Sequence, residues 1–326
     1  MDSRTTKSTI DRDAASVDQF AADVRYYLSL TPRQLPSRYL YDELGSSLFE
    51  SICRLPWYTI TRAETRLLAA HGEDVFRRLR SVANIVELGP GNGEKLRTLL
   101  QAASPRRDVM DVHLVDVSAS ALAIAAQNIG TVGNLRVVTH QATYDSGLRD
   151  AARQRTGRTL VAFLGSNIGN FDPPGACAFL QNIRAGVEIG DAVLLGVDLV
   201  KPTERLLVAY DDPLGVTAAF NRNLLVRINR ELGGSIALDE FSHRAVWDGE
   251  RRRVEMHLVA RSGQVIRIPR VQVAERLEAG EVIWTESSYK YLPEQLDDLL
   301  RSCGFSPSEK WIDHDDAFAL TLAEAC

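Results

Sequence analysis

Residues 85–95 read Ile-Val-Glu-Leu-Gly-Pro-Gly-Asn-Gly-Glu-Lys, and this stretch guides the interpretation of the whole chain. Its β-branched apolar start predicts a buried strand, and its three alternating glycines predict a tight turn into a helix. Glycine has no Cβ, so a ligand can lie directly against the backbone, where the first turn of the helix presents unpaired N–H groups. Turns of this kind hold the ligand in many α/β proteins, so we expect a nucleotide-like ligand here.

Predicted strands and helices alternate from residue 82 onward, which is typical of a mainly parallel sheet. The strands are expected at residues 84–88, 112–117, 135–140, 159–164 and 192–198, and the helices at 94–103, 119–128 (with Ser118 as its cap) and 174–187. After residue 201 the pattern changes. Residues 203–232 look helical, and two hairpins are expected to turn at Asp248-Gly249 and Ser262-Gly263. A strand (282–291), a helix (293–303) and a strand (317–323) then follow.

The first 80 residues are expected to be mostly helical. Apolar residues recur at helical spacing from residue 17 to residue 30, where Thr31-Pro32 ends the pattern. Further on, Thr61-Arg62-Ala63-Glu64 fits a capping box that would start a helix running to about His71.

Composition narrows the classes of function. The chain has 326 residues, is 45% hydrophobic and 25% charged, and carries a net charge of −5 without a long basic run. These values are ordinary for a globular protein and argue against nucleic acid as the main partner. No leader-like segment or membrane-spanning apolar run is evident, so we expect a cytoplasmic protein, and we further expect a monomer. A zinc site and a disulfide framework are not expected, because the cysteines form no CxxC pair: Cys53, Cys177, Cys303 and Cys326.

Two classes of enzyme use such a glycine turn. Dinucleotide oxidoreductases show G-x-G-x-x-G, whereas here the glycines alternate and follow Glu87. The pattern Glu-x-Gly-x-Gly-x-Gly resembles motif I of class I S-adenosylmethionine methyltransferases. An acidic residue beside the turn would repel a pyrophosphate but can pair with cationic groups of S-adenosylmethionine. Asp116, at the end of the second strand, can accept both ribose hydroxyls in either class, so the oxidoreductase remains an alternative.

Several further segments resemble one family, the histidine-specific methyltransferases, which include the L-histidine Nα-methyltransferases of ergothioneine biosynthesis. Together they span roughly residues 20–323, and the Gly-Ser-x-Ile-Gly-Asn and Ala-Tyr-Asp-Asp segments are far more specific than the glycine turn. The matching segments are 41–49 (Tyr-Asp-Glu-Leu-Gly-Ser-Ser-Leu-Phe), 55–58, 61–64, 163–170 (Phe-Leu-Gly-Ser-Asn-Ile-Gly-Asn), 198–201, 209–212 (Ala-Tyr-Asp-Asp), 215–223, 255–256 and 285–290 (Thr-Glu-Ser-Ser-Tyr-Lys).

The resemblance implies a Rossmann-like α/β sheet that binds S-adenosylmethionine, with a second, substrate-binding lobe. The expected division is a disordered tail (1–15), a helical segment contributing to the substrate lobe (16–80), a cofactor-binding domain (81–201 with 292–326) and an inserted substrate-binding lobe (202–291).

The resemblance also implies roles for individual residues. It assigns Gly89, Lys95 and Asp116 to the cofactor, to which the turn adds Glu87, Gly91 and Gly93. Asn170 and Tyr210 would hold the substrate carboxylate, and Tyr58 with the backbone of Gly165 would lie near its α-amine. Glu286 and Ser288 would bind the imidazole. Met256, Thr217 and Tyr41 would line or close this pocket.

One segment departs from the family. Where the family carries Gly-Asp-Phe near the adenine, this chain has Ala142-Thr143-Tyr144. Thr143 can still hydrogen-bond the adenine amine and Tyr144 can still stack on the ring, so the cofactor prediction is kept.

The predicted reaction is attack of the neutral α-amine on the sulfonium methyl, with S-adenosylhomocysteine as the product and Tyr58 helping to remove the proton. Three such transfers would give trimethylated histidine, hercynine, with no need for a metal. Arginine also suits Glu286, and a tryptophan derivative is a weaker alternative substrate. A non-catalytic protein that binds S-adenosylmethionine is the remaining alternative.

Overall fold

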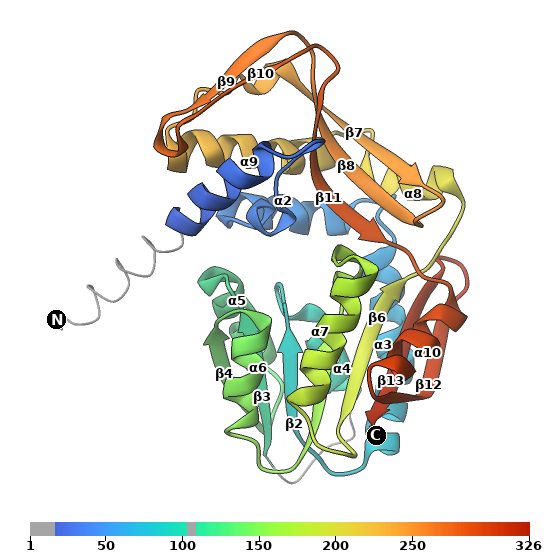
Figure 1. The fold of residues 1–326 in the computed structure, drawn as a ribbon. Helices are drawn as coiled ribbons and strands as arrows, with labels where there is room; N and C mark the ends of the chain where they lie inside the picture. The colour runs from blue at the N-terminus through green and yellow to red at the C-terminus, as the bar shows by residue number, and fades with distance from the viewer. Residues whose placement is uncertain (1–16, 103–108) are drawn as a thin grey trace, which may run out of the picture. The chain divides into compact units, whose positions relative to one another are not determined.

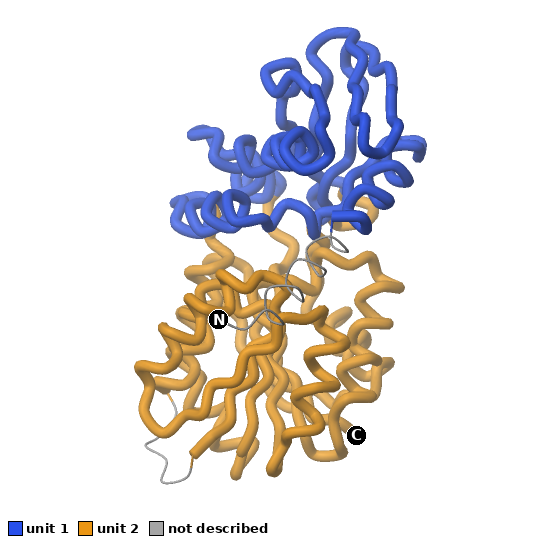
Figure 2. The backbone as a smooth tube through the Cα atoms, turned by 90° about the vertical axis from the view of Figure 1, so that its left-hand side faces the viewer, with its two compact units in different colours: residues 1–57, 203–248, 254–287 blue, residues 58–202, 249–253, 288–326 orange. Residues whose placement is uncertain are grey.

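The computed structural model describes residues 17–102 and 109–326, and the contacts divide the chain into two compact units. Unit 1 comprises residues 1–57, 203–248 and 254–287, and unit 2 comprises residues 58–202, 249–253 and 288–326 (Figure 2). The expected tail over residues 1–15 lies outside the described residues. The division expected from the sequence stays a prediction. In the contact-based units the helix α3 (Ile60–Leu79) belongs to unit 2.

Unit 2 is built on a seven-stranded sheet over the described residues, with the order β12-β13-β6-β5-β2-β3-β4 (Figure 1). Neighbouring strands from β6 to β4 pair in parallel, whereas β13 is antiparallel to both β6 and β12. The strand bounds are β2 (Val82–Leu88), β3 (Met110–Asp116), β4 (Leu135–Gln141), β5 (Arg158–Phe163), β6 (Ala192–Asp198), β12 (Phe305–Asp313) and β13 (Phe318–Ala325). The α/β sheet predicted from the alternating pattern is therefore confirmed.

Helices cover both faces of this sheet. One apolar core joins the sheet to α6 (Tyr144–Ala152), α7 (Pro173–Ala185) and α10 (Pro293–Ser302). The elements α3, α4 (Glu94–Gln101) and α5 (Ala119–Ile129) pack together and on the sheet strands. Ser118 caps α5 as predicted, since its hydroxyl accepts from the N–H of Ala121 at 3.3 Å.

The order in which successive strands are added to the sheet reverses between β2 and β5. These two strands are adjacent, and the chain proceeds from β2 to β3 on one side and from β5 to β6 on the other. Ligands of open α/β sheets bind outside the carboxyl ends of the strands at such a switch point. In unit 2 this point lies where β2 ends in the glycine turn and β5 ends in the loop before η2 (Asn167–Asn170).

Unit 1 contains a four-stranded sheet with the order β1-β11-β8-β7 and a separate pair, β10-β9. The strands are β1 (Arg33–Gln34), β7 (Phe241–Asp248), β8 (Arg253–Ala260), β9 (Gln264–Ile268), β10 (Val273–Leu277) and β11 (Val282–Tyr289). The helical elements are the helix over residues 17–28, η1 (Ser37–Leu40), α2 (Glu43–Arg54), α8 (Thr203–Tyr210), α9 (Val216–Leu232), η3 (Leu238–Glu240) and η4 (Pro269–Val271). Its buried side chains include Phe20, Leu40, Phe220 and Phe241.

Two local predictions are wrong. Thr61–Glu64 does not form a capping box, because α3 begins two residues earlier, with Thr59 as its N-cap, and continues to Leu79. The Ser262-Gly263 turn does not close a hairpin, because β8 and β9 belong to different sheets. Instead β9 pairs with β10, with Ile268 opposite Val273. Both errors arise because each sequence motif was assigned a partner that is close to it in the chain. The structure instead uses a partner that is distant or that comes later in the chain.

A lipid bilayer could not be crossed by any helix that the structure describes, since each is too short or too polar.

The central strands should dominate stability. Leu194 in β6 is completely buried, so Leu194→Ala should lower the free energy of unfolding by about 2–5 kcal/mol through lost burial and a residual cavity. Ile189, which precedes β6 and is 81% exposed, provides the control, and Ile189→Ala should change it by less than about 0.5 kcal/mol. Urea unfolding followed by circular dichroism measures both, and equal effects would contradict the assigned core.

Candidate active site

The glycine turn adopts the conformation that its sequence predicts. Gly89, Gly91 and Gly93 have φ angles of 72°, 56° and 78°, in the left-handed region that favours glycine. A Cβ at Gly89 would lie 2.8 Å from the hydroxyl of Tyr144, whereas a Cβ at Gly91 would meet nothing within 4 Å. The turn thus packs tightly at its start and leaves open space at Gly91, so a ligand can approach the bare backbone.

Glu87, in β2 just before this turn, is a buried acid. Its side chain is 1% exposed, and no hydrogen-bond partner for Oε2 exists among the described residues. Burial raises the pKa of Glu87 to about 8, against the lowering effect of the Lys95 charge. An unsatisfied buried carboxyl is costly unless a ligand completes its environment, and a cationic ligand would favour its ionised form.

Asp116 ends β3, the strand next to β2, as predicted. Its carboxylate accepts a hydrogen bond from the backbone N–H of Ser118 at 2.8 Å, which fixes the side chain at the start of α5. The group is partly exposed, and burial raises its pKa. A fixed carboxylate at this strand end can accept hydrogen bonds from vicinal hydroxyls.

Thr143 and Tyr144 begin α6, near the same end of the sheet. Thr143 is exposed and makes no side-chain cap. The ring of Tyr144 packs edge-on against Phe163 and Phe179, at centroid distances of 5.6 and 5.7 Å. Burial raises the pKa of its hydroxyl, which also lies close to Gly89. The structure therefore gives Tyr144 a packing role beside the glycine turn.

Glu64 is a site residue that the sequence reasoning missed. It is fully buried on α3, and its two carboxylate oxygens accept from the backbone N–H of Gly165 at 2.9 and 2.8 Å. The ammonium of Lys95 lies 2.8 Å from Oε2 of the same carboxylate. Glu64 therefore connects the helix after the glycine turn to the loop after β5. Its motif, Thr-x-x-Glu, has the same spacing as a capping box, which hid this role.

Gly196 makes room for this carboxylate. A Cβ at Gly196, in the middle of β6, would lie 1.8 Å from Oε1 of Glu64. An otherwise unexplained glycine inside a buried strand was the sequence signal that could have revealed a close neighbour.

The loop after β5 brings more polar groups to the switch point. Gly165 has a φ angle of 78°, and a Cβ there would lie 2.8 Å from the ammonium of Lys95 and 3.6 Å from the amide nitrogen of Asn167. The same Asn167 amide would lie 3.3 Å from a Cβ at Gly89, so this loop and the glycine turn are neighbours. Asn170, which was predicted to hold a carboxylate, lies at the end of η2 and is exposed.

In unit 1, a buried network fixes the backbone of Tyr210. Nε2 of His243 lies 2.7 Å from the Tyr210 carbonyl, and the amide of Asn221 lies 2.9 Å from Nδ1 of His243. Burial lowers the pKa of His243, which favours a neutral ring with Nε2 as the donor and Nδ1 as the acceptor. The Ala-Tyr-Asp-Asp segment thus ends α8 in one defined conformation.

Asp212, in the same segment, has a structural role. Its carboxylate accepts from the backbone N–H groups of Leu214, Val216 and Thr217, the last at 2.7 Å. Burial alone would raise its pKa, but these hydrogen bonds outweigh burial and lower it. The carboxylate therefore holds the first turn of α9, where the predicted pocket residue Thr217 is buried.

The other predicted residues of unit 1 lie in its aromatic cluster and its sheet. The ring of Tyr41 lies 5.4 Å from both Phe49 and Phe220. Met256 on β8 and Glu286 on β11 are 2% and 8% exposed and come from neighbouring strands, where the hydroxyl of Thr285 donates to the Met256 carbonyl. The structure places Tyr58 and Ser288, both buried, in unit 2.

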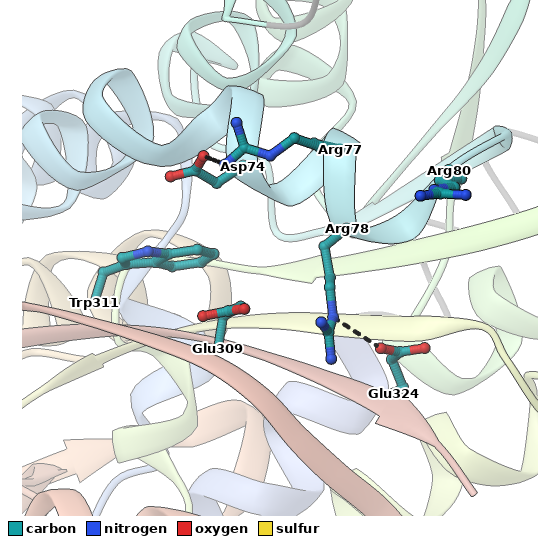
Figure 3. A pocket seen from close by; sticks show the side chains of 7 residues that line it. All are labelled: Asp74, Arg77, Arg78, Arg80, Glu309, Trp311 and Glu324. Atoms are coloured by element: carbon teal, nitrogen blue, oxygen red, sulfur yellow. Dashed lines mark hydrogen bonds and ion pairs between the residues drawn. The ribbon is translucent and has the colours of Figure 1, made fainter.

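Unit 2 also has a cavity of about 570 Å³ that contains none of the predicted site residues. Figure 3 shows it between the C-terminal half of α3 and the strands β12 and β13. Three arginines and three carboxylates line it beside Trp311, and Arg77 with Asp74 and Arg78 with Glu324 form ion pairs. Its charges are therefore largely balanced within the protein.

Metal-ligating side chains do not cluster in the described residues, where no group of three or more His, Cys, Asp or Glu could hold an ion. No disulfide joins the four cysteines, all of which lie in the described part of the chain.

Comparison with known proteins identifies the family. A model described as "Histidine-specific methyltransferase, SAM-dependent" matches residues 20–325. The chain belongs to this family. It is 37% identical to the histidine N-alpha-methyltransferase of Mycolicibacterium smegmatis, over 95% of this chain and 96% of the relative, and 39% identical to that of Mycobacterium tuberculosis, over 92% and 93%. It is also 28% identical to Ergothioneine biosynthesis protein 1 of Neurospora crassa, over 95% of this chain but 36% of that longer protein.

The family membership makes S-adenosylmethionine the cofactor, and the residues at the switch point fit it. The open backbone at Gly91 offers the close approach, Asp116 offers a fixed acceptor, and Glu87 offers an unsatisfied acid for a cationic group. The dinucleotide oxidoreductase alternative is ruled out by the family assignment.

The raised pKa of Glu87 makes stability depend on pH. In the folded chain this carboxyl keeps its proton up to about pH 8, whereas in the unfolded chain it loses it near the ordinary value of 4.5. The free energy of unfolding should therefore decrease from about pH 5 to about pH 8. Glu87→Gln, which cannot ionise, should abolish this decrease and be the more stable protein at about pH 8.

Urea unfolding at several pH values measures this effect. Glu94→Gln, an exposed change beside the same turn, is the control and should keep the pH dependence of the parent. Parallel pH curves for Glu87→Gln and the parent would show that Glu87 is already ionised.

Glu64→Gln should weaken both the fold and cofactor binding. The amide cannot accept at both positions and no longer neutralises Lys95, so the free energy of unfolding should fall by about 1–3 kcal/mol. Loss of one charge-assisted contact at Lys95 should raise the Kd for S-adenosylhomocysteine roughly tenfold. Calorimetric titration measures it, with Glu73→Gln as the exposed control on the same helix. An unchanged Kd would separate Glu64 from the cofactor.

Proposed function

We propose that this protein transfers methyl groups from S-adenosylmethionine to the α-amine of L-histidine, up to the trimethylated betaine hercynine, in ergothioneine biosynthesis. The observation that carries the proposal is the 37–39% identity, over at least 92% of the chain, to two proteins named histidine N-alpha-methyltransferase. The family description and the relative named for ergothioneine biosynthesis support the same conclusion.

S-adenosylmethionine supplies a methyl group that its sulfonium already activates. The protein then has to align the amine, exclude water and remove a proton. Gly89, Gly91 and Gly93 are assigned to the turn that holds the cofactor, with the backbone open to close approach at Gly91. Asp116 accepts from the ribose hydroxyls. Lys95 has its charge balanced by Glu64, so no uncompensated lysine charge opposes a cationic cofactor.

The polarity of Gly165 suits an amine substrate. Its N–H already donates to Glu64, so the group that Gly165 can offer to a ligand is its carbonyl oxygen. A carbonyl accepts a hydrogen bond from the amine and orients the nitrogen lone pair. We assign removal of the amine proton to Tyr58, directly or through water, as the candidate catalytic residue.

The remaining roles are assigned from the family resemblance. Asn170 and Tyr210 bind the substrate carboxylate through neutral donors, which need no buried countercharge. Glu286 and Ser288 bind the imidazole, while Thr217, Met256 and Tyr41 contact or close over the substrate. A small-molecule amino-acid substrate agrees with the family. We further propose that the enzyme is cytoplasmic and monomeric, and that it has no nucleic-acid partner and needs no metal.

One assay tests the function. Purified protein is incubated with S-adenosylmethionine and each of the twenty amino acids, and the products are weighed by mass spectrometry. Gains of up to three methyl groups on histidine alone are expected. Methylation of arginine or tryptophan with histidine unchanged would overturn the substrate but keep the chemistry. Cofactor binding without turnover on any amino acid would favour the non-catalytic alternative.

The role of Glu286 is tested separately. Because its carboxylate would accept from the imidazole N–H, Glu286→Ala should raise the KM for histidine at least tenfold. The Kd for S-adenosylhomocysteine should change by less than about threefold, because this side chain is not assigned to the cofactor. Glu278→Ala, an exposed glutamate, is the control and should leave both constants unchanged. Equal losses in both constants would assign Glu286 a structural role.

A further inference from the structure

Two cysteines from different helices of unit 2 are in direct contact. Cys177 lies in α7, and Cys303 is the residue that ends α10. Their sulfur atoms are 3.4 Å apart, and the Cys303 sulfur also lies 3.6 Å from the carbonyl oxygen of Cys177. The two residues are 126 positions apart in the sequence, so it is the fold that brings them together.

Packing around the two thiols holds this contact in place. Cys303 is 4% exposed and belongs to the apolar core that joins α7 and α10 to the sheet, and Cys177 packs against the same core. A second contact lies next to it, because Nε of Arg184, near the end of α7, donates to the carbonyl of Gly304 at 3.1 Å. The end of α10 is therefore attached to α7 both at Cys303 and at the residue that follows it.

The surroundings of the two thiols give them different reactivity. Cys177 is half-buried, so a small molecule can reach it from solvent. Burial raises the pKa of the Cys303 thiol to about 11, and this thiol therefore stays protonated. The thiolate is the nucleophile in cysteine oxidation. Cys177 is thus the cysteine that reacts first with an oxidant, and Cys303 is its nearest partner for a second step.

We propose that Cys177 and Cys303 form a reversible oxidation site, at which a hydroperoxide produces a disulfide that ties α7 to α10 and stabilises unit 2. The Cys177 thiolate attacks the peroxide, the O–O bond breaks, and a sulfenic acid forms while an alcohol or water leaves. The Cys303 sulfur then attacks the Cys177 sulfur and the S–O bond breaks. The Cys303 proton leaves with the oxygen as water. The two thiols together lose two electrons, and the hydroperoxide gains them.

The geometry favours the disulfide over further oxidation. A disulfide bond is shorter than the present contact, so side-chain rotation and a small shift of the helix ends have to close the difference. The second step is intramolecular, which gives Cys303 an advantage over another molecule of oxidant. In a reducing compartment the pair stays a dithiol until an oxidant appears, and exchange with a small thiol restores it. Neither cysteine is assigned to the cofactor or the substrate, so the inference is independent of the proposed function.

The positions of lysine and arginine allow a direct test by mass spectrometry. Trypsin releases each of the cysteines Cys53, Cys177, Cys303 and Cys326 on a different peptide, which are residues 39–54, 159–184, 302–310 and 311–326 respectively. The full chain is treated with hydrogen peroxide, the remaining thiols are blocked, and the digest is analysed before and after reduction.

The expected main linked product joins residues 159–184 to residues 302–310 and separates on reduction. Cys177→Ser should abolish this product, whereas Cys326→Ser, an exposed change at the end of the chain, should leave it unchanged. The absence of a linked product, with sulfinic acid accumulating instead, would overturn the proposal. So would a product that joins Cys303 to Cys326, whose backbone N–H donates to the Gly304 carbonyl at 3.1 Å.

Oxidation of the urea-unfolded chain shows whether the fold selects the pair. Cys177 then has three possible partners, so the share of the expected product should fall at least about threefold. An equal share in the unfolded chain would mean that the contact between α7 and α10 is not the cause, and the proposal would fail.

Thermal unfolding tests the stabilising effect. A disulfide between residues so far apart in the sequence restricts the unfolded chain, so the oxidised parent should have a Tm higher than the reduced parent by about 2 °C or more. Oxidised Cys177→Ser should show no such increase. An unchanged or lower Tm in the oxidised parent would contradict a tie that fits the native fold. None of these measurements uses methyl transfer, so a failure of the proposed function would leave their outcome unaffected.

Discussion

The predicted cofactor site of unit 2 depends on the hydrogen bonds and the ion pair that the buried carboxylate of Glu64 makes. One side chain on α3 binds both the helix that follows the glycine turn, through Lys95, and the loop that follows β5, through the N–H of Gly165. Glu64 thereby fixes the segment after β2 and the segment after β5 relative to each other, and it can do so without contacting a ligand. The absence of a side chain at Gly196 is the steric condition for this arrangement.

Unit 2 buries a second charge cluster, around Asp198, at the end of the adjacent strand β6. In both clusters a buried carboxylate pairs with lysine near the carboxyl ends of the sheet strands. Gly165 keeps a carbonyl acceptor, because its N–H donates to Glu64. The Glu64 carboxylate therefore leaves the loop after β5 with a neutral acceptor at Gly165.

The sequence predicted the parallel sheet and its glycine turn well, because buried strands and left-handed turns leave local signals. It missed the strand β12, whose residues 305–313 include a proline and several charges, because that strand lies at the edge of its sheet and tolerates them. It also misread Glu64, since the spacing of a capping box carries no information about a partner a hundred residues away. Family resemblance predicted individual substrate-binding residues, but it did not reveal His243, which fixes the backbone of Tyr210.

The late pairing of β13 with β6 has a consequence for biosynthesis of the chain. Phe318 of β13 pairs with Asp198 of β6, so the ribosome synthesises the partner strand of β6 more than a hundred residues after β6 itself. At ordinary synthesis rates this leaves a hydrophobic strand without its neighbour for on the order of 10 s. The nascent chain therefore exposes a strand edge during translation, and a chaperone that shields apolar segments would have its natural target there.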